Sequence, residues 1–385
     1  MSGAACLTCM AGLPREVLAG DPHERGVRHG EAFADEVRHN VDTYLDVLRA
    51  RGIGTDRARD LAAGFVPRIE EVNAAYAAEM AGVAEGSGVP VEEVALVNVR
   101  YEVLYNAYTD EDGGGEDDGT RTRTDAEAAA SVDGCTSFGV GPEASADGHT
   151  YVGQNWDWLP AVETFLMEVR RDDGPDFLAV TEAGMVGGKF GFNERGIGYA
   201  VNGLATPEDG EHPFRKPTHV RGREILEAER FDAAIEPVIA TDRPGSRNYL
   251  LGHAEGELLD LETAPEVVNY LYPEGGLLAH ANHFENQSGV ESRLERLSPH
   301  SLVRGARMRR LLEREAGDID PGTLKAVLRD DFCHPNGICR YAADGAAEGR
   351  DYHTKVSIVM DLTDRRILLT DGPPRGTEYR EYRLT

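Results

Sequence analysis

The chain has 385 residues, enough for one large domain or two ordinary ones, and its 68 acidic and 40 basic residues give a net charge of −28. A chain this acidic repels nucleic-acid phosphates and anionic lipid headgroups, so we expect no nucleic acid and no membrane as a partner. Only four basic residues are lysines, namely Lys189, Lys216, Lys325 and Lys355. Acidic excess with scarce lysine predicts a halophilic protein, because salt screening weakens the repulsion between surface carboxylates. An ordinary acidic cytosolic enzyme is the alternative.

The N-terminal segment and the cysteines favour a cytoplasmic protein without a metal. Residues 1–12 lack the basic segment and long apolar core of a secretory signal, and no stretch reaches the roughly 18 apolar residues of a membrane span. Cys6, Cys9, Cys333 and Cys339 are the candidates for a four-sulfur zinc site. Two residues separate the first pair and five separate the second, and this unequal spacing argues against zinc. No organic cofactor is expected either.

The first third of the sequence predicts helices. Residues 21–51 place apolar side chains at helical spacing, with Asp21 as N-cap and Pro22 at the first helical position. Further helices are predicted for residues 56–83 and 90–108.

The composition then changes twice. Residues 109–131 combine glycine, acidic residues and threonine with almost nothing to bury, which predicts a disordered surface linker. From Cys135 the apolar spacing predicts strands, and the first two form a hairpin whose loop contains Asp147 and Gly148.

More strands and three helical segments follow to the end of the chain. The further predicted strand regions are 164–171, 176–182, 189–193, 197–202, a pair within 247–262, a pair within 266–283, and a closing hairpin over 354–372. The further predicted helices are 221–240, 298–317 and 321–331. Helices first, then many strands interrupted by a helical block, indicate an α+β layered fold rather than alternating βαβ units.

Cys135 is the candidate nucleophile. A thiol reacts as its thiolate and needs a positioned base. If the Gly134–Cys135 peptide bond breaks, Cys135 gains an α-amine with an ordinary pKa of about 7.7–8.0, which suits general base catalysis near neutral pH. Gly134 has no Cβ and tolerates the backbone geometry that such self-cleavage requires. A plain turn before a strand is the alternative interpretation of this Gly-Cys pair.

Four segments in the same order strengthen the first interpretation. They are DGCTSFG around Cys135, GQNWDW at 153–158, NERGIGYAVNGL at 193–204 and HANHF at 280–284. Together they resemble the acyl-CoA:6-aminopenicillanic acid acyltransferase family, which belongs to the N-terminal nucleophile hydrolases. The resemblance continues in RGVRHGEAFADEV at 25–37, NVRYE at 98–102 and TKVSIVMDL at 354–362, so it covers nearly the whole chain.

The resemblance implies a four-layer αββα sandwich built from one chain that cuts itself. Residues 1–134 would form the helical α-chain segment and residues 135–385 the catalytic β-chain, and the two would stay associated in one domain after cleavage. The implied activity is amide hydrolysis or acyl transfer on a linear amide or thioester bond, with a small-molecule amide or an acyl-CoA as the substrate.

The resemblance also implies roles for individual residues. Asp157 would orient the amine of Cys135, and Asn282 and Asn202 would stabilise the oxyanion. Trp156 is a candidate for substrate binding.

Two further positions bear on the substrate. Arg304 matches a family arginine that follows a serine, here Ser301, by three residues, and it is a candidate for substrate binding. Gln154 stands where related hydrolases carry an arginine, which argues against a substrate of the bile-salt or penicillin V type.

Two rival interpretations stay open at this point. One is a Cys–His protease that uses His149, His280 or His283 without self-cleavage, although the residues around Cys135 do not match the papain signature. The other is a self-cleaving protein without small-molecule activity.

Overall fold

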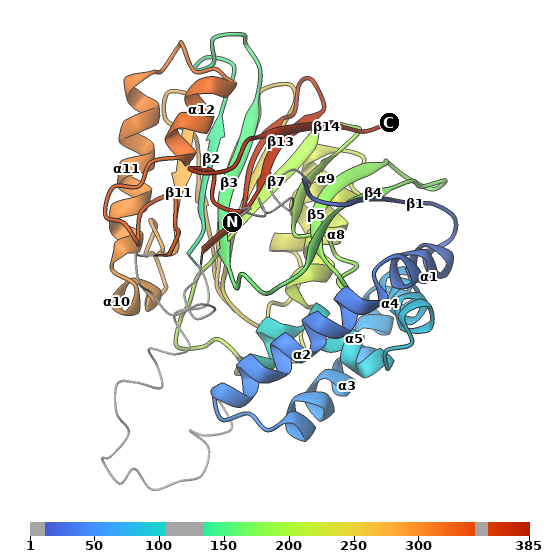
Figure 1. Cartoon of the computed structure of the whole chain (residues 1–385). Helices are drawn as coiled ribbons and strands as arrows, with labels where there is room; N and C mark the ends of the chain where they lie inside the picture. Colours follow the sequence, from blue (N-terminus) through green and yellow to red (C-terminus); the bar gives the residue numbers. More distant parts are fainter. Residues whose placement is uncertain (1–11, 105–133, 343–352) are drawn as a thin grey trace, which may run out of the picture.

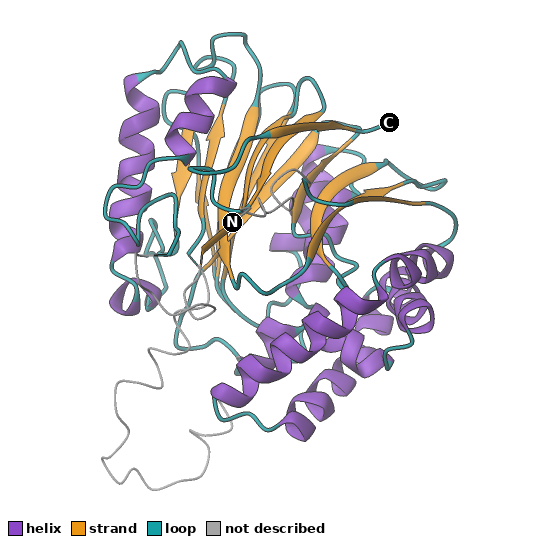
Figure 2. Cartoon of the chain, viewed as in Figure 1, coloured by secondary structure: helices purple, strands orange, loops and turns teal. Residues whose placement is uncertain are grey.

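The computed structural model describes residues 12–104, 134–342 and 353–385, and in them two β-sheets pack face to face with helices on both outer sides. Figure 1 and Figure 2 show the resulting layers, helix, sheet, sheet and helix. The fold is therefore the four-layer αββα sandwich that the resemblance implied, and its α+β class is confirmed. The predicted linker over 109–131 lies outside the described residues.

The larger sheet has eight strands in the order β1-β4-β5-β6-β7-β8-β9-β10. Their bounds are β1 Arg15–Leu18, β4 Thr164–Val169, β5 Phe177–Glu182, β6 Phe190–Asn193, β7 Ile197–Gly203, β8 Arg247–His253, β9 Leu258–Thr263 and β10 Val268–Leu271. All neighbours pair antiparallel except β1, which runs parallel to β4. The strand β1 comes from the N-terminal segment and was not predicted.

The smaller sheet has six strands in the order β11-β2-β3-β12-β13-β14. Their bounds are β11 Leu277–His280, β2 Thr136–Val140, β3 Tyr151–Trp158, β12 His353–Asp361, β13 Arg366–Asp371 and β14 Arg380–Arg383. The predicted hairpin is confirmed, since β2 and β3 pair antiparallel with Thr136 opposite Asn155. The predicted pair within 266–283 is wrong, because β10 pairs with β9 in one sheet and β11 pairs with β2 in the other.

Helices cover the outer faces of both sheets. The N-terminal block consists of α1 Pro22–Ala32, α2 Ala34–Ala50, α3 Thr55–Val72, α4 Ala74–Ser87 and α5 Val91–Asn98. The helices α8 Thr218–Leu226 and α9 Phe231–Ile239 pack on the larger sheet. The helices α10 Leu294–Leu297, α11 His300–Arg314 and α12 Pro321–Leu328 follow, and α11 and α12 cover the smaller sheet. In the described part of the chain, no helix combines the length and the apolar character needed to cross a bilayer.

Several of the predicted helices are divided in the structure: the one over 221–240 forms α8 and α9, and the first two N-terminal ones are divided at Phe33 and Asn73. Asp21 caps α1 as predicted, but Phe33 leaves the helical conformation and stacks its ring on Phe165, 4.2 Å away between centroids. The helix predicted over 56–83 is divided at Asn73, whose backbone is extended and whose side chain accepts from Tyr76 N to cap α4. Asparagine at such a position is a strong N-cap signal, so this second division was readable from the sequence.

Glycines let α1 and α4 pack backbone against backbone. A Cβ on Gly26 would lie 2.0 Å from the Glu79 carbonyl oxygen, and a Cβ on Gly82 would lie 2.2 Å from that of His23. No real Cβ tolerates these distances, so only glycine permits this spacing. The N-terminal helices are thereby fixed as one block beside the larger sheet.

Candidate active site

Cys135 lies at the start of an interior strand. It precedes β2, which is hydrogen-bonded to β3 on one side and to β11 on the other, with Ser137 opposite His280 in β11. The Cys135 side chain is buried, at 1% exposure. Both neighbouring strands hold β2 in place, so the residue just before it has little freedom to move.

Asp157 lies beside the predicted cleavage site. In the β2–β3 ladder Thr136 faces Asn155, so Asp157 lies further along β3, next to Gly134. A Cβ built on Gly134 would be 2.9 Å from Asp157 Oδ2 and 2.2 Å from Arg340 Nη1, so a larger residue there would displace these two side chains. Thr354 Oγ1 donates to Asp157 Oδ1 at 2.7 Å, which fixes the orientation of the carboxylate.

Arg304 holds the backbone on both sides of Cys135. Its Nη1 donates to the Gly134 carbonyl oxygen at 2.7 Å, to the Cys135 carbonyl oxygen at 2.6 Å and to Thr136 Oγ1 at 2.8 Å. Arg304 projects from α11 and is 1% exposed. A buried guanidinium on a carbonyl oxygen polarises that carbonyl and stabilises negative charge on it. The sequence suggested a substrate contact for Arg304, whereas in the uncut chain it contacts the predicted cleavage site.

Asn282 positions this arginine. Its Oδ1 accepts from Arg304 Nη2 at 2.8 Å, and its Nδ2 donates to the Gly203 carbonyl oxygen at 3.0 Å. The Asn282 backbone N–H donates to Ser301 Oγ, which also meets His283 Nδ1. Asn282 is thus beside the predicted cleavage site, with one amide N–H directed at Gly203.

Two buried amide side chains between the sheets, Asn202 and Gln154, have N–H groups that donate to no described acceptor. Asn202 Oδ1 accepts from Ser137 Oγ at 2.7 Å, and Gln154 Oε1 accepts from Val201 N at 2.8 Å. The Val201 N–H, which can only donate, fixes the Gln154 amide with its oxygen towards Val201. Within the described residues, Asn202 Nδ2 and Gln154 Nε2 are buried without a hydrogen-bond acceptor. Because Ser137 is two residues from Cys135 on the same strand face, these donors are near the thiol and suit a developing oxyanion.

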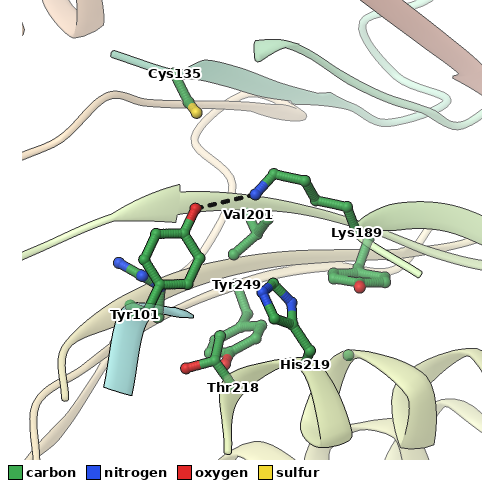
Figure 3. Close-up of a pocket in the computed structure, with 10 residues that line it drawn as sticks. Tyr101, Cys135, Lys189, Val201, Thr218, His219 and Tyr249 are labelled. Carbon is green, nitrogen blue, oxygen red and sulfur yellow. Dashed lines mark hydrogen bonds between the residues drawn. The ribbon is translucent and has the colours of Figure 1, made fainter. Parts of the chain in front are cut away.

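A small cavity opens beside Cys135, and Figure 3 shows the thiol directed towards the side chains of Tyr101 and Lys189. Its volume is about 10 Å³, room for about one water molecule. The lining residues are Tyr101, Cys135, Lys189, Tyr199, Val201, Thr218, His219, Gly222, Arg247 and Tyr249. Lys189 Nζ donates to Tyr101 Oη at 3.0 Å and lies 4.5 Å from the ring centroid of Trp156. Trp156 thus contacts this lysine, although it is not one of the described residues that line the cavity.

The histidines named by the rival Cys–His interpretation have other partners. His149 Nδ1 contacts Asp361 at 3.1 Å, at the turn end of the β2–β3 hairpin and roughly 16 Å of strand away from Cys135. His280 Nε2 contacts Glu262 at 2.8 Å and its Nδ1 contacts the Ala281 carbonyl oxygen at 2.9 Å. Burial alone would lower the pKa of His280, but the neighbouring Asp260 and Glu262 carboxylates raise it to about 9. A histidine held as a cation is not a general base.

His219 lines the same cavity as Cys135 and was missed from the sequence. Arg100 Nη1 lies 2.7 Å from His219 Nε2, so Nε2 accepts and the proton of the neutral ring is on Nδ1. Burial, with the positive charges of Arg100, Lys189 and Arg247, holds the pKa of His219 well below its usual range. Such a ring is a weak base, and the geometry does not favour a Cys–His pair.

The remaining cysteines are separate from this site. Cys333 is exposed and Cys339 is buried, and both are free thiols. Cys6 and Cys9 lie outside the described residues, so the zinc hypothesis is not tested there. In the described ranges, the group with metal-ligand spacing is His149, Asp361 and Asp364, which contains no cysteine.

Other cavity residues lacked a usable signal in the sequence. Tyr101 lies in the family-like NVRYE segment, and Lys189 is one of only four lysines, which was a weak hint. Arg247 and Thr218 stand in no motif, and only the packing of β8 and α8 brings them to Cys135.

An αββα sandwich with a buried cysteine at the head of an interior strand defines an enzyme of the N-terminal nucleophile hydrolase type. The family described as acyl-coenzyme A:6-aminopenicillanic acid acyl-transferase matches residues 144–370, more than half of the chain. The chain therefore belongs to that family of amide hydrolases and acyltransferases. The match includes Asp157, Asn202, Asn282 and Arg304 and begins after Cys135.

Individual relatives agree with this membership. The acyl-coenzyme A:6-aminopenicillanic-acid-acyltransferase 40 kDa form of Emericella nidulans is 25% identical over 366 residues, which cover 93% of this chain and 92% of the relative. Among solved structures, the Caenorhabditis elegans ortholog of N-acylethanolamine-hydrolyzing acid amidase aligns with a TM-score of 0.45 and 14% identity over 60% of this chain and 93% of that chain. Penicillin V acylase from Agrobacterium tumefaciens aligns with a TM-score of 0.37 and 15% identity over 61% of this chain and 82% of that chain. Structural similarity at this level does not bear on the substrate.

Proposed function

We propose that this chain cuts its own Gly134–Cys135 bond and that Cys135 then hydrolyses or transfers the acyl group of a small linear amide or thioester. The observation that carries this proposal is the contact of Arg304 Nη1 with the Gly134 carbonyl oxygen at 2.7 Å, immediately before the buried Cys135. A guanidinium in this place stabilises an oxyanion formed by attack on the Gly134 carbonyl.

The proposed cleavage is an acyl shift followed by hydrolysis. The Cys135 sulfur attacks the Gly134 carbonyl carbon, and negative charge develops on the oxygen that Arg304 contacts. The Gly134–Cys135 C–N bond breaks, the thiol proton goes to the departing nitrogen, and a thioester joins Gly134 to the Cys135 sulfur. Water then adds to the thioester carbonyl, which releases Gly134 as a carboxylate and restores the thiol.

The same thiol performs the proposed reaction on substrates. The new α-amine of Cys135 accepts the thiol proton and returns it to the leaving amine, and Asp157 orients that amine from the adjacent strand. Asn202, and Asn282 through the amide N–H that is not directed at Gly203, supply N–H donors to the substrate oxyanion. Water or an acceptor amine resolves the acyl-enzyme.

The two proposed chains share one core and are expected to stay together. The segment before the cut supplies β1, which pairs with β4, and Asn40 of α2, whose side chain donates to the Glu163 and Ala183 carbonyl oxygens. The buried residues of α2 to α5 pack in the same core as those of the larger sheet. Separating the chains would expose this core, which is strongly unfavourable.

Intact mass, N-terminal sequencing and a substrate panel test this proposal. Purified protein should contain chains of 134 and 385 − 134 = 251 residues, the larger one beginning Cys-Thr-Ser-Phe. It should also release amine or thiol from at least one of a panel of acyl amides and acyl-CoA thioesters. An uncut, active chain would exclude the amine mechanism, and a cut chain inactive on the whole panel would favour a self-cleaving protein without small-molecule activity.

A further inference from the structure

The contact with Ser137 does not by itself decide which end of the Asn202 amide faces the nucleophile. Ser137 Oγ lies 2.7 Å from Asn202 Oδ1, and a hydroxyl group can either donate or accept. Asn202 can act as an oxyanion donor only with its Nδ2 turned away from Ser137 and towards the reacting carbonyl oxygen. A second contact therefore has to fix this amide.

Asn248 makes that second contact from the neighbouring strand. It lies in β8 directly opposite Asn202 in β7, so the two side chains are on the same face of the larger sheet. Both side chains are buried. Asn248 Nδ2 donates to Asn202 Oδ1 at 3.4 Å, a long hydrogen bond of the kind that shortens when a substrate binds.

A buried carboxylate lies on the other side of Asn248. Asp260 in β9 is 0% exposed and is two residues from Glu262, the residue directly opposite Asn248. Asn248 and Asp260 are therefore diagonal neighbours on one face of the sheet. Burial raises the pKa of Asp260 to about 6, and the His280 cation and the Asn248 amide act against this rise. The Asn248 amide thus acts on this carboxylate, although neither Asp260 oxygen has a fully formed hydrogen bond within the described residues.

Glu262 does not compete for the Asn248 amide, although it is directly opposite. Its carboxylate already accepts from His280 Nε2 at 2.8 Å and from two backbone N–H groups after β11, at 2.5 Å and 2.9 Å. In the described part of the chain Asp260 has no comparable donor. Asp260 is therefore the carboxylate to which the Asn248 amide can turn.

We propose that Asp260 and Asn248 are positioning residues that set the direction of the Asn202 amide and so make it an oxyanion donor. This inference rests on the proposed function, in which Cys135 is the nucleophile and Asn202 contacts the substrate oxyanion. An ionised carboxylate only accepts, so one Nδ2 proton of Asn248 turns towards Asp260. The other Nδ2 proton then faces Asn202 Oδ1, and Asn202 Nδ2 is left for the substrate.

The reverse direction of these amides is unfavourable. With Asn248 turned over, its Oδ1 would face the Asp260 carboxylate, two acceptors with no proton between them, and Asn202 would have to turn over as well. In the structure Asn248 Nδ2 faces Asn202, and Asn248 Oδ1 is the atom that lacks a partner in the described residues. His280 supports the observed direction, because its positive charge favours the ionised form of Asp260.

An exchange of the two side chains separates positioning from stability. In Asn248→Asp the donor to Asn202 becomes an acceptor, so kcat on the best amide or thioester of the panel should fall about 10²-fold with nearly unchanged KM. The melting temperature should fall as well, because two buried carboxylates become neighbours. Combining Asn248→Asp with Asp260→Asn restores one amide and one carboxylate and should recover most of the melting temperature. Its kcat should stay about 10²-fold low, because residue 248 still cannot donate to Asn202.

Asn269→Asp is the matched control. Asn269 lies in β10 opposite Glu262, on the same sheet face, and its Nδ2 donates to two backbone carbonyl oxygens after β11. This variant should lose stability and keep the kcat of the wild type. All variants should still cut themselves, because the proposed cleavage oxyanion contacts Arg304 and not Asn202. A kcat for Asn248→Asp equal to that of the control, or a kcat that recovers in the exchange variant, would overturn the inference.

Neutron diffraction from crystals of the wild-type protein tests the direction without any variant or substrate. Deuterium on the Asn202 nitrogen should lie on the side away from Ser137, and deuterium on the Asn248 nitrogen should lie towards Asn202 and Asp260. The reverse assignment of either amide would overturn the inference. A protein that turns over no amide or thioester would contradict the proposed function, and the neutron result would still decide the direction of the amides.

Discussion

Replacing Arg304 by methionine should slow self-cleavage about 10²–10³-fold, the cost of removing one oxyanion donor. Arg304 Nη1 contacts the Gly134 carbonyl oxygen at 2.7 Å, and the same group contacts the Cys135 carbonyl oxygen at 2.6 Å. Methionine keeps the length and apolar character of the side chain and removes all of these donors. The transition state of cleavage, in which charge builds on the Gly134 oxygen, then loses about 2.7–4 kcal/mol.

Stability should fall in the same variant. Two carbonyl oxygens, Thr136 Oγ1 and Asn282 Oδ1 all accept from Arg304 in a buried site. Leaving such acceptors short of a donor costs about 1–3 kcal/mol each, with incomplete additivity, against a total stability of about 5–15 kcal/mol. Arg304→Lys restores the charge and part of the bonding, and it should cut at an intermediate rate.

The assay follows uncut chain from cell-free synthesis on a denaturing gel over time, with folding checked by circular dichroism and melting. The control is Arg307→Met, one turn further along α11, which removes a partly exposed ion pair with Asp330. This control should lose about 1 kcal/mol or less and cut at the wild-type rate. A folded Arg304→Met chain that cuts as fast as the control would refute the proposed role of Arg304.

Four further outcomes are expected. Cys135→Ala should give one uncut, inactive 385-residue chain, whereas the wild type should give two chains on the same gel. Asn202→Ala and Asn282→Ala should each lower kcat on the best substrate by about 10²–10³ with nearly unchanged KM, and wild-type kcat in either variant would remove that asparagine from the oxyanion site. The melting temperature should rise with potassium chloride well beyond physiological concentration because the net charge is −28, and a maximum at low salt would exclude halophilic adaptation. Burial lowers the pKa of His29 from 6.5 to about 3, so between these pH values the unfolded chain binds a proton that the folded chain does not. The free energy of unfolding should therefore fall, as the pH drops from 6.5 to 3, by up to about 1.4 kcal/mol per pH unit. His29→Gln, whose side chain can still accept from Gly184 N, should flatten this slope in acid unfolding curves.

The parts of the fold and the site that the sequence predicted depend on residues close together in the chain. The position of Asp157 beside Gly134 follows from pairing two strands adjacent in the sequence as a hairpin across the loop 141–150, with Val140 opposite Tyr151. The cap at Asp21 likewise depends only on neighbouring residues.

Long-range packing decided what the sequence did not predict. Arg304 reaches a carbonyl 170 positions earlier in the chain, and its motif gave no hint of that partner. The segment after β9 has the same strand-like composition on both sides of its turn, yet its second strand crosses to the other sheet. Lys189 and Arg247 line the same cavity only because β6 and β8 both begin at the same edge of the larger sheet.

The interior position of β2 has a consequence for activation. The ladder with β3 and β11 begins at Thr136 and Ser137, so a cut after Gly134 falls just outside hydrogen bonds that remain unchanged. Arg304 also keeps its contacts with the Cys135 carbonyl oxygen and Thr136 Oγ1, which lie on the retained side of the cut. The new N-terminus at Cys135 is therefore already in position in the uncut protein and does not need to move after cleavage. Turnover should therefore begin as soon as the bond is broken, with no lag for refolding, and the precursor would already have the shape of the mature enzyme.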